Sequence, residues 1–381
     1  MTASPRDPQT RPDRLALATL LTAQQDEVAQ QVTAEFLERH PEWQRHFGDE
    51  AWTRGVEDVR SHISFLAGAI QSGDTDAFRE YARWSAGVLQ SRAMSSTLLI
   101  QSLEEVRDHI ARMVDPPAAA LIRDVVNTGC AAIRDADTGT PASATAAGTG
   151  DRASSASRPE RAATSPVEAV NDDDRSLYLQ AVLAGERRTA LVAALEPLQR
   201  GASVADIYCD LLQPTQYAIG RLWERNQISV AREHMATAIT QYVVSQLYGR
   251  LSIPAAVRGN AIVTGVEGEL HQLGANMVAD VLEAAGWNVR FLGTQLPHRD
   301  VLGAIEEHEP RVVGISATML FSLPRVGQLV EEMRTRFPAD MRIVVGGGAF
   351  RGRPRIWRDV GADGFAEDLR DGATLVNRLT S

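Results

Sequence analysis

The stretch Gly265-Val266-Glu267-Gly268-Glu269-Leu270-His271-Gln272-Leu273-Gly274 follows an apolar run, 261–266, and precedes a helical segment. Short apolar runs recur at 289–292, 312–315 and 343–345, and helical segments separate them. This alternation predicts a doubly wound α/β domain, Rossmann-like or flavodoxin-like, with parallel strands over 255–381. Ligands of such sheets bind beyond the carboxyl ends of the strands, where this loop would lie.

His271 is the residue of this loop best suited to bind a metal, because neutral imidazole is a good ligand for cobalt and similar metals. Glu269 is placed to accept a hydrogen bond from the other ring N–H and to raise the basicity of the ligand. Gly274 would permit a close approach of the backbone. A histidine in a loop is, however, more often ordinary surface chemistry, so further matches are needed.

The spacing from Glu269 to Gly274 resembles the Asp-x-His-x-x-Gly motif of cobalamin-binding domains, in which the histidine replaces the nucleotide base of the cofactor on cobalt. Segments 316–318, 345–350 and 363–366 are similar, in order, to the Ser-x-Leu/Thr strand end, the Gly-Gly turn and the following short strand of that family. The resemblance covers 174–381 and implies His271 as the lower cobalt ligand. It implies these cofactor-binding residues: Glu269, Gly274, Ser316, Thr318, Gly346 and Gly347.

A second pattern precedes the α/β segment. Trp223 is followed, after nine residues, by Glu233-His234, an arrangement that resembles adenosylcobalamin photoreceptors of the type that represses carotenoid synthesis. The resemblance implies that Trp223 and Glu233 contact the adenosyl group, and that His234 becomes the upper cobalt ligand after photolysis. An indole offers flat apolar area and a carboxylate accepts ribose hydroxyls, which suits these roles. Ordinary packing of a helical cap in a methyl-carrying corrinoid protein is the alternative.

The first half of the chain is predicted to be helical. Apolar residues recur at spacings of three and four over five segments, so 13–137 should form an all-α, bundle-like or globin-like domain after a disordered tail, 1–12. Residues 138–172 are rich in Ala, Ser, Thr, Gly and Pro and should form a flexible linker. Residues 173–254 are again helical and should form a four-helix bundle that caps the upper face of the corrin.

A globin-like domain, a linker and a corrinoid module in this order resemble the photocobilins, which join a bilin-binding domain to a cobalamin-binding one. The resemblance implies biliverdin as a second cofactor. His62, Tyr81, Arg83 and Trp84 are the candidate bilin contacts, although an aromatic stripe at helical spacing is more often core. Cys130 is the thiol near the end of the last helix that could form a thioether, and we favour a non-covalent site.

The leading functional prediction is a light sensor without catalytic activity of its own, in which photolysis of the cobalt–carbon bond changes conformation or assembly. The alternatives are a corrinoid methyl carrier of a methyltransferase system and a haem-based gas sensor with an attached cobalamin domain. The resemblance also implies a homo-oligomer, with light-dependent association, and an unidentified signalling partner.

Composition excludes several other classes. A formal net charge of −10 argues against a nucleic-acid-binding surface. No apolar run approaches the roughly 20 residues that span a bilayer, and the polar N-terminus lacks the apolar core of a signal peptide. Two cysteines are too few for a disulfide framework. A cytoplasmic protein that binds neither membrane nor nucleic acid is expected.

Overall fold

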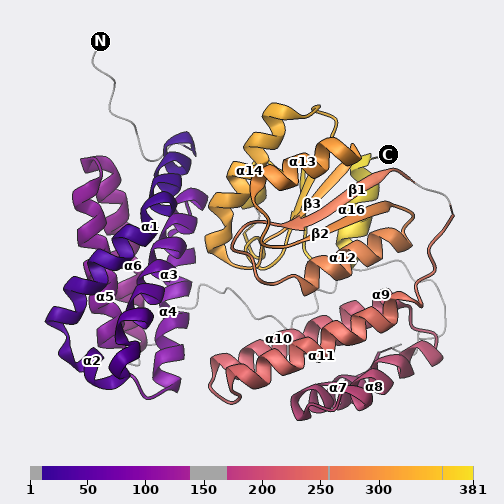
Figure 1. The fold of residues 1–381 in the computed structure, drawn as a ribbon, viewed down its shortest axis with the longest axis horizontal. Coiled ribbons are helices and arrows are strands. Elements are labelled where there is room, and N and C mark those ends of the chain that lie inside the picture. The colour runs from indigo at the N-terminus through magenta and orange to yellow at the C-terminus, as the bar shows by residue number, and fades with distance from the viewer. Residues whose placement is uncertain (1–10, 138–169, 256–257, 354, 381) are drawn as a thin grey trace, which may run out of the picture. The chain divides into compact units, whose positions relative to one another are not determined.

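The computed structural model describes residues 11–137, 170–255, 258–353 and 355–380 (Figure 1). Residues 1–10 of the expected tail and 138–169 of the expected linker lie outside the described residues, whereas residues 11, 12 and 172 are helical. The described chain divides into two compact units. One unit combines the N-terminal helices with the α/β domain, and the other is the helical segment between them in sequence.

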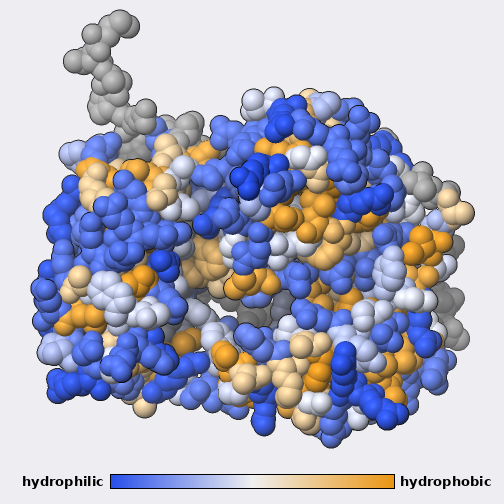
Figure 2. All heavy atoms as spheres, viewed as in Figure 1, coloured by the Kyte–Doolittle hydropathy of each residue, from blue (hydrophilic) through white to orange (hydrophobic). Residues whose placement is uncertain are grey.

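The N-terminal segment is all-helical, as its apolar periodicity predicted. Its elements are α1 (Arg11–Arg39), α2 (Pro41–Phe47), η1 (Gly48–Glu50), α3 (Ala51–Ser72), α4 (Thr75–Ser91), α5 (Ser96–Met113) and α6 (Pro116–Asp137). Asp74 caps α4 by accepting hydrogen bonds from the N–H groups of Asp76 and Ala77. The side of these helices visible in Figure 2 is mainly hydrophilic, with apolar residues in small groups, as amphipathic helices around a core require.

The short helix α2 was not predicted from the sequence. Pro41 is the first residue of α2, where its missing N–H costs no hydrogen bond and its fixed φ suits a helix. Trp43 of α2 is buried and donates from Nε1 to the carbonyl of Ala51 at 3.1 Å. The same proline therefore ends one helix and begins the next.

The second unit contains four helical stretches. They are α7 (Asp172–Ala184), α8 (Arg187–Gln199), a continuous run of α9 (Val204–Ile207), the π-helical turn η2 (Tyr208–Leu212) and α10 (Gln213–Glu224), and finally α11 (Val230–Tyr248). Asn171 and Asp174 form a reciprocal capping box that begins α7. Gly185 ends α7 in the left-handed region at φ 80°, where a residue without Cβ is favoured.

The α/β domain has a parallel sheet of five strands in the order β2-β1-β3-β4-β5. The strands are β1 (Asn260–Gly265), β2 (Asn288–Gly293), β3 (Val312–Ser316), β4 (Arg342–Gly346) and β5 (Gly364–Ala366). The helical elements are α12 (Leu273–Ala284), α13 (His298–His308), η3 (Leu320–Ser322), α14 (Leu323–Arg336), α15 (Ile356–Asp359) and α16 (Leu369–Thr380). The predicted doubly wound α/β domain with parallel strands is confirmed, and its strand order is the flavodoxin-like one.

Alternate residues of β1 face opposite sides of the sheet. Ala261 and Val263 pack in a core with α12 and α16, whereas Ile262 belongs to the core on the side of α13 and α14. This second core continues without interruption into the N-terminal helices, where Ile63 and Leu66 are buried. Sequence alone did not predict that the N-terminal and α/β domains share a core.

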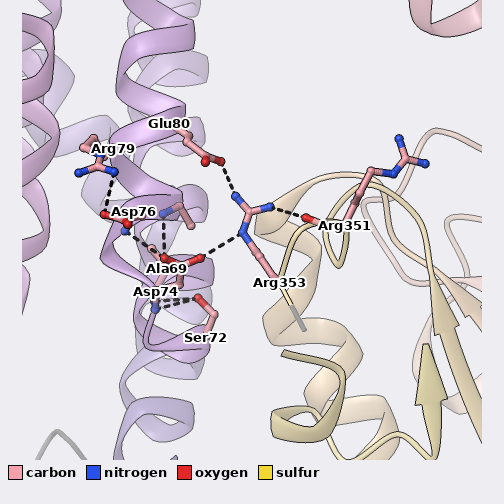
Figure 3. Close-up of polar contacts among 9 residues, drawn as sticks. Ala69, Ser72, Asp74, Asp76, Arg79, Glu80, Arg351 and Arg353 are labelled. Atoms are coloured by element: carbon pink, nitrogen blue, oxygen red, sulfur yellow. Dashed lines mark hydrogen bonds and ion pairs between the residues drawn. The ribbon is translucent and has the colours of Figure 1, made fainter. Parts of the chain in front are cut away.

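Polar contacts hold the same two domains together at their edge. Arg353, before α15, donates to Asp74 at 3.2 Å and to Glu80 at 2.5 Å (Figure 3). Gln328 of α14 donates from Nε2 to Oγ1 of Thr19 in α1 at 2.9 Å. In the parts of the chain that the structure describes, no helix combines the length and the apolarity that crossing a bilayer takes.

Candidate functional site

The loop between β1 and α12 holds Glu269 inside the protein and His271 at its surface. Gly268, at φ 85°, makes the tight turn that brings Glu269 back under the strand ends. The Glu269 side chain is 1% exposed and that of His271 is 57% exposed. One carboxylate oxygen, Oε1, lies 2.6 Å from Nδ1 of His271 and also accepts the His271 N–H at 2.9 Å. The loop thus presents an imidazole that a buried carboxylate orients.

The other oxygen of Glu269 fixes the carboxylate to the neighbouring strand. Oε2 accepts the backbone N–H of Thr318 at 2.7 Å, just beyond β3, and the hydroxyl of Ser322 at 3.4 Å in η3. Burial alone would raise the pKa of Glu269, but hydrogen bonds from the His271 ring and from the N–H groups of Thr318 and His271 leave the pKa lowered. The carboxylate is therefore ionised near neutral pH.

An ionised Glu269 selects the tautomer of His271. Nδ1 carries the proton and donates it to Oε1, so the lone pair is on Nε2, which is the form of imidazole that binds a metal. Glu269 is one methylene longer than the aspartate of the motif, yet the distance to Nδ1 is that of a short hydrogen bond. His271 and Glu269 therefore fit the expected roles, in which one imidazole binds the metal and a carboxylate orients that imidazole.

The strand ends beside this loop are lined by small residues. Ser316, the last residue of β3, pairs in register with Gly265 and Gly346, so three strands end together. Gly347 has φ +100°, and a Cβ there would lie 2.3 Å from the carbonyl oxygen of Ala317. Glycine is thus required by both conformation and space. The ends of these three strands are therefore formed by residues with small side chains or none.

Gly274 lies beside open space in the structure. A Cβ at this position would meet no atom of the protein within 4 Å, and the residue is in the first turn of α12. The protein itself does not require glycine there. The open space is compatible with a ligand, which is the role implied by the resemblance.

The candidates for the upper side lie in the second unit. Ser229 caps α11, and Glu233 and His234 follow in its first turns. Nδ1 of His234 lies 2.5 Å from Oε2 of Glu233, and Oε1 accepts the hydroxyl of Thr237 at 3.0 Å. The His234 side chain is 74% exposed. Glu233 is therefore engaged by His234 and Thr237, whereas we expected it to be available for ribose, so ribose binding would require Glu233 to exchange partners.

Trp223 lies near the end of α10 and is half-buried. It does not share a helix with Glu233 and His234, because α10 ends at Glu224 and α11 begins at Val230. A spacing of nine residues therefore crosses a turn.

The four candidate bilin contacts do not line one pocket. His62 and Tyr81 are buried and share a hydrogen bond of 2.6 Å, whereas Arg83 and Trp84 are exposed on the outer side of α4. Arg83, two positions after Tyr81, lies on another face of the helix. Trp84, three positions after Tyr81, is exposed but keeps a tilted ring contact with it, with ring centres 6.3 Å apart. Burial lowers the pKa of His62 to about 4, so the ring is neutral. His62 and Tyr81 are core residues here, which is the alternative that the sequence left open.

Cys130 is buried, and burial raises the pKa of its thiol to about 11. A protonated, buried thiol is a poor nucleophile. The thiol of Cys130 is therefore poorly suited to forming a thioether.

One contributor to the site was missed entirely. Ser322 is fully buried and donates to Glu269 from 53 residues away. A serine on a helical turn carries no sequence signal by itself, but its place six residues after Ser316 at the end of β3 could have suggested it.

Models of the B12 binding domain match residues 175–248 and 259–373. Dimethylamine corrinoid protein 2 of Methanosarcina mazei is 26% identical over 51% of this chain and 91% of its own length, and dimethylamine corrinoid protein 3 of Methanosarcina acetivorans is 28% identical over 56% and 94%. The monomethylamine corrinoid protein of Methanosarcina barkeri has 20% identity and a TM-score of 0.49, and covers 55% of this chain and 100% of its own.

The chain therefore carries a cobalamin-binding module, with a helical part and a parallel α/β part. The cofactor of this module is a corrinoid.

Proposed function

We propose that this protein is a light sensor that binds adenosylcobalamin with His271 as the lower cobalt ligand. The observation that carries corrinoid binding is the Glu269–His271 pair, in which a buried carboxylate holds Nδ1 and leaves the lone pair on Nε2. A corrin ring itself binds its cobalt, so one imidazole, that of His271, would be the ligand that the protein contributes on the lower side. Adenosylcobalamin, when bound, supplies a cobalt–carbon bond that light breaks.

The pattern Trp223, Glu233 and His234 supports light sensing. In this proposal Trp223 provides apolar area for the adenosyl group, and Glu233 turns from His234 toward the ribose hydroxyls. Because cobalt has one upper position, His234 stands aside in the dark. The exposed imidazole of His234 would be the protein ligand available to the metal after light, and α11, which bears it, would move with it. Such an event is local but shifts a two-state equilibrium.

The N-terminal domain would carry the second chromophore. We propose biliverdin bound without a covalent link, because Cys130 is buried and protonated. The output would be a change of conformation or of assembly between copies, read by a separate signalling protein in the cytoplasm. Neither nucleic acid nor membrane is a direct partner in this proposal.

Similarity to the dimethylamine corrinoid proteins favours a second candidate, a corrinoid methyl carrier that serves a methyltransferase. In that case the protein would take part in methyl transfer while the partner supplies catalysis. Glu233 and His234 oppose this role, since a methyl carrier needs an upper side open to the substrate of its partner. The relatives favour the carrier, and the Trp223 to His234 pattern favours the sensor.

Absorption spectra of the purified full chain separate these functions. The sensor requires adenosylcobalamin bands that bleach under green light, followed by a spectrum with two axial imidazoles. Stable binding of methylcobalamin with methyl loss only in the presence of a methyl acceptor and a methyltransferase would establish the carrier. A Soret band that follows added haem, with no corrinoid response to light, would favour the gas sensor.

A further inference from the structure

The turn η3 contacts the N-terminal helix α3 and the lower-ligand loop at the same time. Its three residues, Leu320, Phe321 and Ser322, precede α14 directly. Ser322 donates to Glu269 at 3.4 Å, and Glu269 orients His271. Any displacement of η3 therefore changes the hydrogen bonding of the carboxylate behind the proposed cobalt ligand.

The backbone of α3 is in direct contact with the backbone of η3. A Cβ on Gly68 would lie 2.4 Å from the carbonyl oxygen of Leu320, so the backbones are in direct contact and glycine is required. Gln71, one turn later, is buried and donates from Nε2 to the carbonyl of Leu323 at 3.2 Å. These two residues fix the position of η3 from the N-terminal side.

Aromatic rings extend the contact into the core of the helical domain. Phe65 meets Phe321 edge to face, with ring centres 5.5 Å apart and planes at 85°. The other side of Phe65 stacks on Tyr81 at 3.8 Å and 12°, and Tyr81 is hydrogen-bonded to His62. Successive residues of one turn thus touch Gly68, Phe65 and Glu269.

We propose that Phe65, Gly68 and Gln71 are positioning residues for the lower cobalt ligand, so that the N-terminal domain sets how firmly His271 holds a corrinoid. The inference rests on the proposed ligation by His271. Close-packed interfaces respond to a change by shifting as units rather than by deforming gradually. By linkage, ligation at His271 would stabilise the α3–η3 contact to the same extent.

Two glutamines of this interface provide a matched pair. Gln71→Met removes the hydrogen bond to Leu323 at nearly constant side-chain length. Gln328→Met removes the bond to Thr19 across the same interface, but Gln328 is five residues farther along α14 from η3 than Leu323. A role limited to holding the domains together would make both variants behave alike. Positioning of the ligand requires that only Gln71→Met affects His271.

The experiment uses the full chain with ¹⁵N-labelled histidine, loaded with aquacobalamin and reduced to the cobalt(II) state. Nitrogen splitting in the electron paramagnetic resonance spectrum then distinguishes the imidazole of His271 from the nucleotide base of the cofactor. We expect Gln71→Met to lower the histidine-bound fraction and to accelerate cofactor dissociation roughly three- to tenfold, less than the 10- to 100-fold typical of losing a direct partner of the ligand. Gln328→Met should leave both measurements unchanged.

A double-mutant cycle decides whether the effect passes through the ligand. In a His271→Ala background, Gln71→Met should no longer change the dissociation rate, because there is no imidazole to position. An effect of equal size in both backgrounds would overturn the inference, as would equal effects of the two glutamine variants. If His271→Ala itself leaves the spectrum unchanged, the proposed ligation fails instead, so the two failures are distinguishable.

Gly68→Ala is the stronger perturbation, because the added methyl meets backbone. It should displace η3 and lower the histidine-bound fraction more than Gln71→Met does. Gly87→Ala is its control, since a Cβ on Gly87 in α4 would meet nothing within 4 Å. Should Gly68→Ala not fold, the pair of glutamine variants still tests the proposal.

Discussion

Glu269 and His271, two residues apart, differ almost completely in exposure: the carboxylate is 1% exposed and the imidazole 57% exposed, yet Oε1 and Nδ1 are 2.6 Å apart. A carboxylate in this environment needs every donor around it, because burying an unpaired charge is costly. Three backbone and side-chain donors besides the ring meet that need. The pair therefore links the folded core to the surface that receives the cofactor.

Replacing Glu269 with Gln should weaken corrinoid binding. The amide can still accept from Nδ1, but it carries no charge to raise the basicity of His271, and its NH₂ group opposes the N–H of Thr318. We expect an affinity loss of about 10- to 100-fold, measured by titration with aquacobalamin. Glu267→Gln, in the exposed part of the same loop, is the control. Equal affinities for the two variants would contradict the role of Glu269.

Gly347→Ala should destabilise the α/β domain and the edge that receives the ligand. The residue has φ +100°, and the methyl would meet the carbonyl of Ala317. We expect a loss of about 1–3 kcal/mol in the free energy of unfolding, measured by denaturant titration. Gly303→Ala in α13 is the matched control, because its Cβ meets nothing and its φ is ordinary. That variant should be unchanged or more stable by up to roughly 1 kcal/mol.

The buried His62 should make the protein sensitive to acid. Burial lowers its pKa from 6.5 to about 4, so the unfolded chain binds a proton that the folded chain excludes. The contribution to stability is complete above pH 6.5 and is lost as pH falls toward 4, by roughly 3 kcal/mol in total. In His62→Gln, the free energy of unfolding should fall less steeply between these pH values. The exposed His46→Gln serves as control, and a wild-type slope in His62→Gln would refute the assignment.

The variant His234→Ala should distinguish a light sensor from a methyl carrier. Dark binding of adenosylcobalamin and photolysis should persist, because the dark state does not use this imidazole. After light, water rather than imidazole should occupy the upper position, and the accompanying change in conformation should be smaller. Absorption spectroscopy and small-angle scattering before and after illumination measure the two effects. A bis-imidazole spectrum in the illuminated variant would exclude His234 as the ligand.

Biliverdin should bind the full chain and leave it on denaturation. Co-expression with a biliverdin source should give a red-absorbing protein whose chromophore is released in acid urea, since the thiol of Cys130 is buried and protonated. Cys130→Ser should bind the chromophore equally. Colour retained by the denatured wild type and lost in Cys130→Ser would show a thioether at Cys130.

The sequence by itself determined the features that depend on neighbouring residues. The apolar runs and the loop from Gly265 to Gly274 predicted the parallel sheet and the edge that bears His271, because alternating strands and helices admit few arrangements. Glu269 and His271 are two residues apart, so their contact needs only a local turn. The helices before residue 137 followed from periodicity for the same reason.

Only the tertiary structure decided which residues from distant parts of the chain contact these positions. Periodicity shows which face of a helix is buried but not against which partner. Hence Ser322 behind Glu269, Gln71 on the carbonyl of Leu323, and the core shared by α3 and the sheet could not be predicted. His62 and Tyr81 became core residues, while Arg83 and Trp84 stayed exposed, because helix packing determined which face was covered.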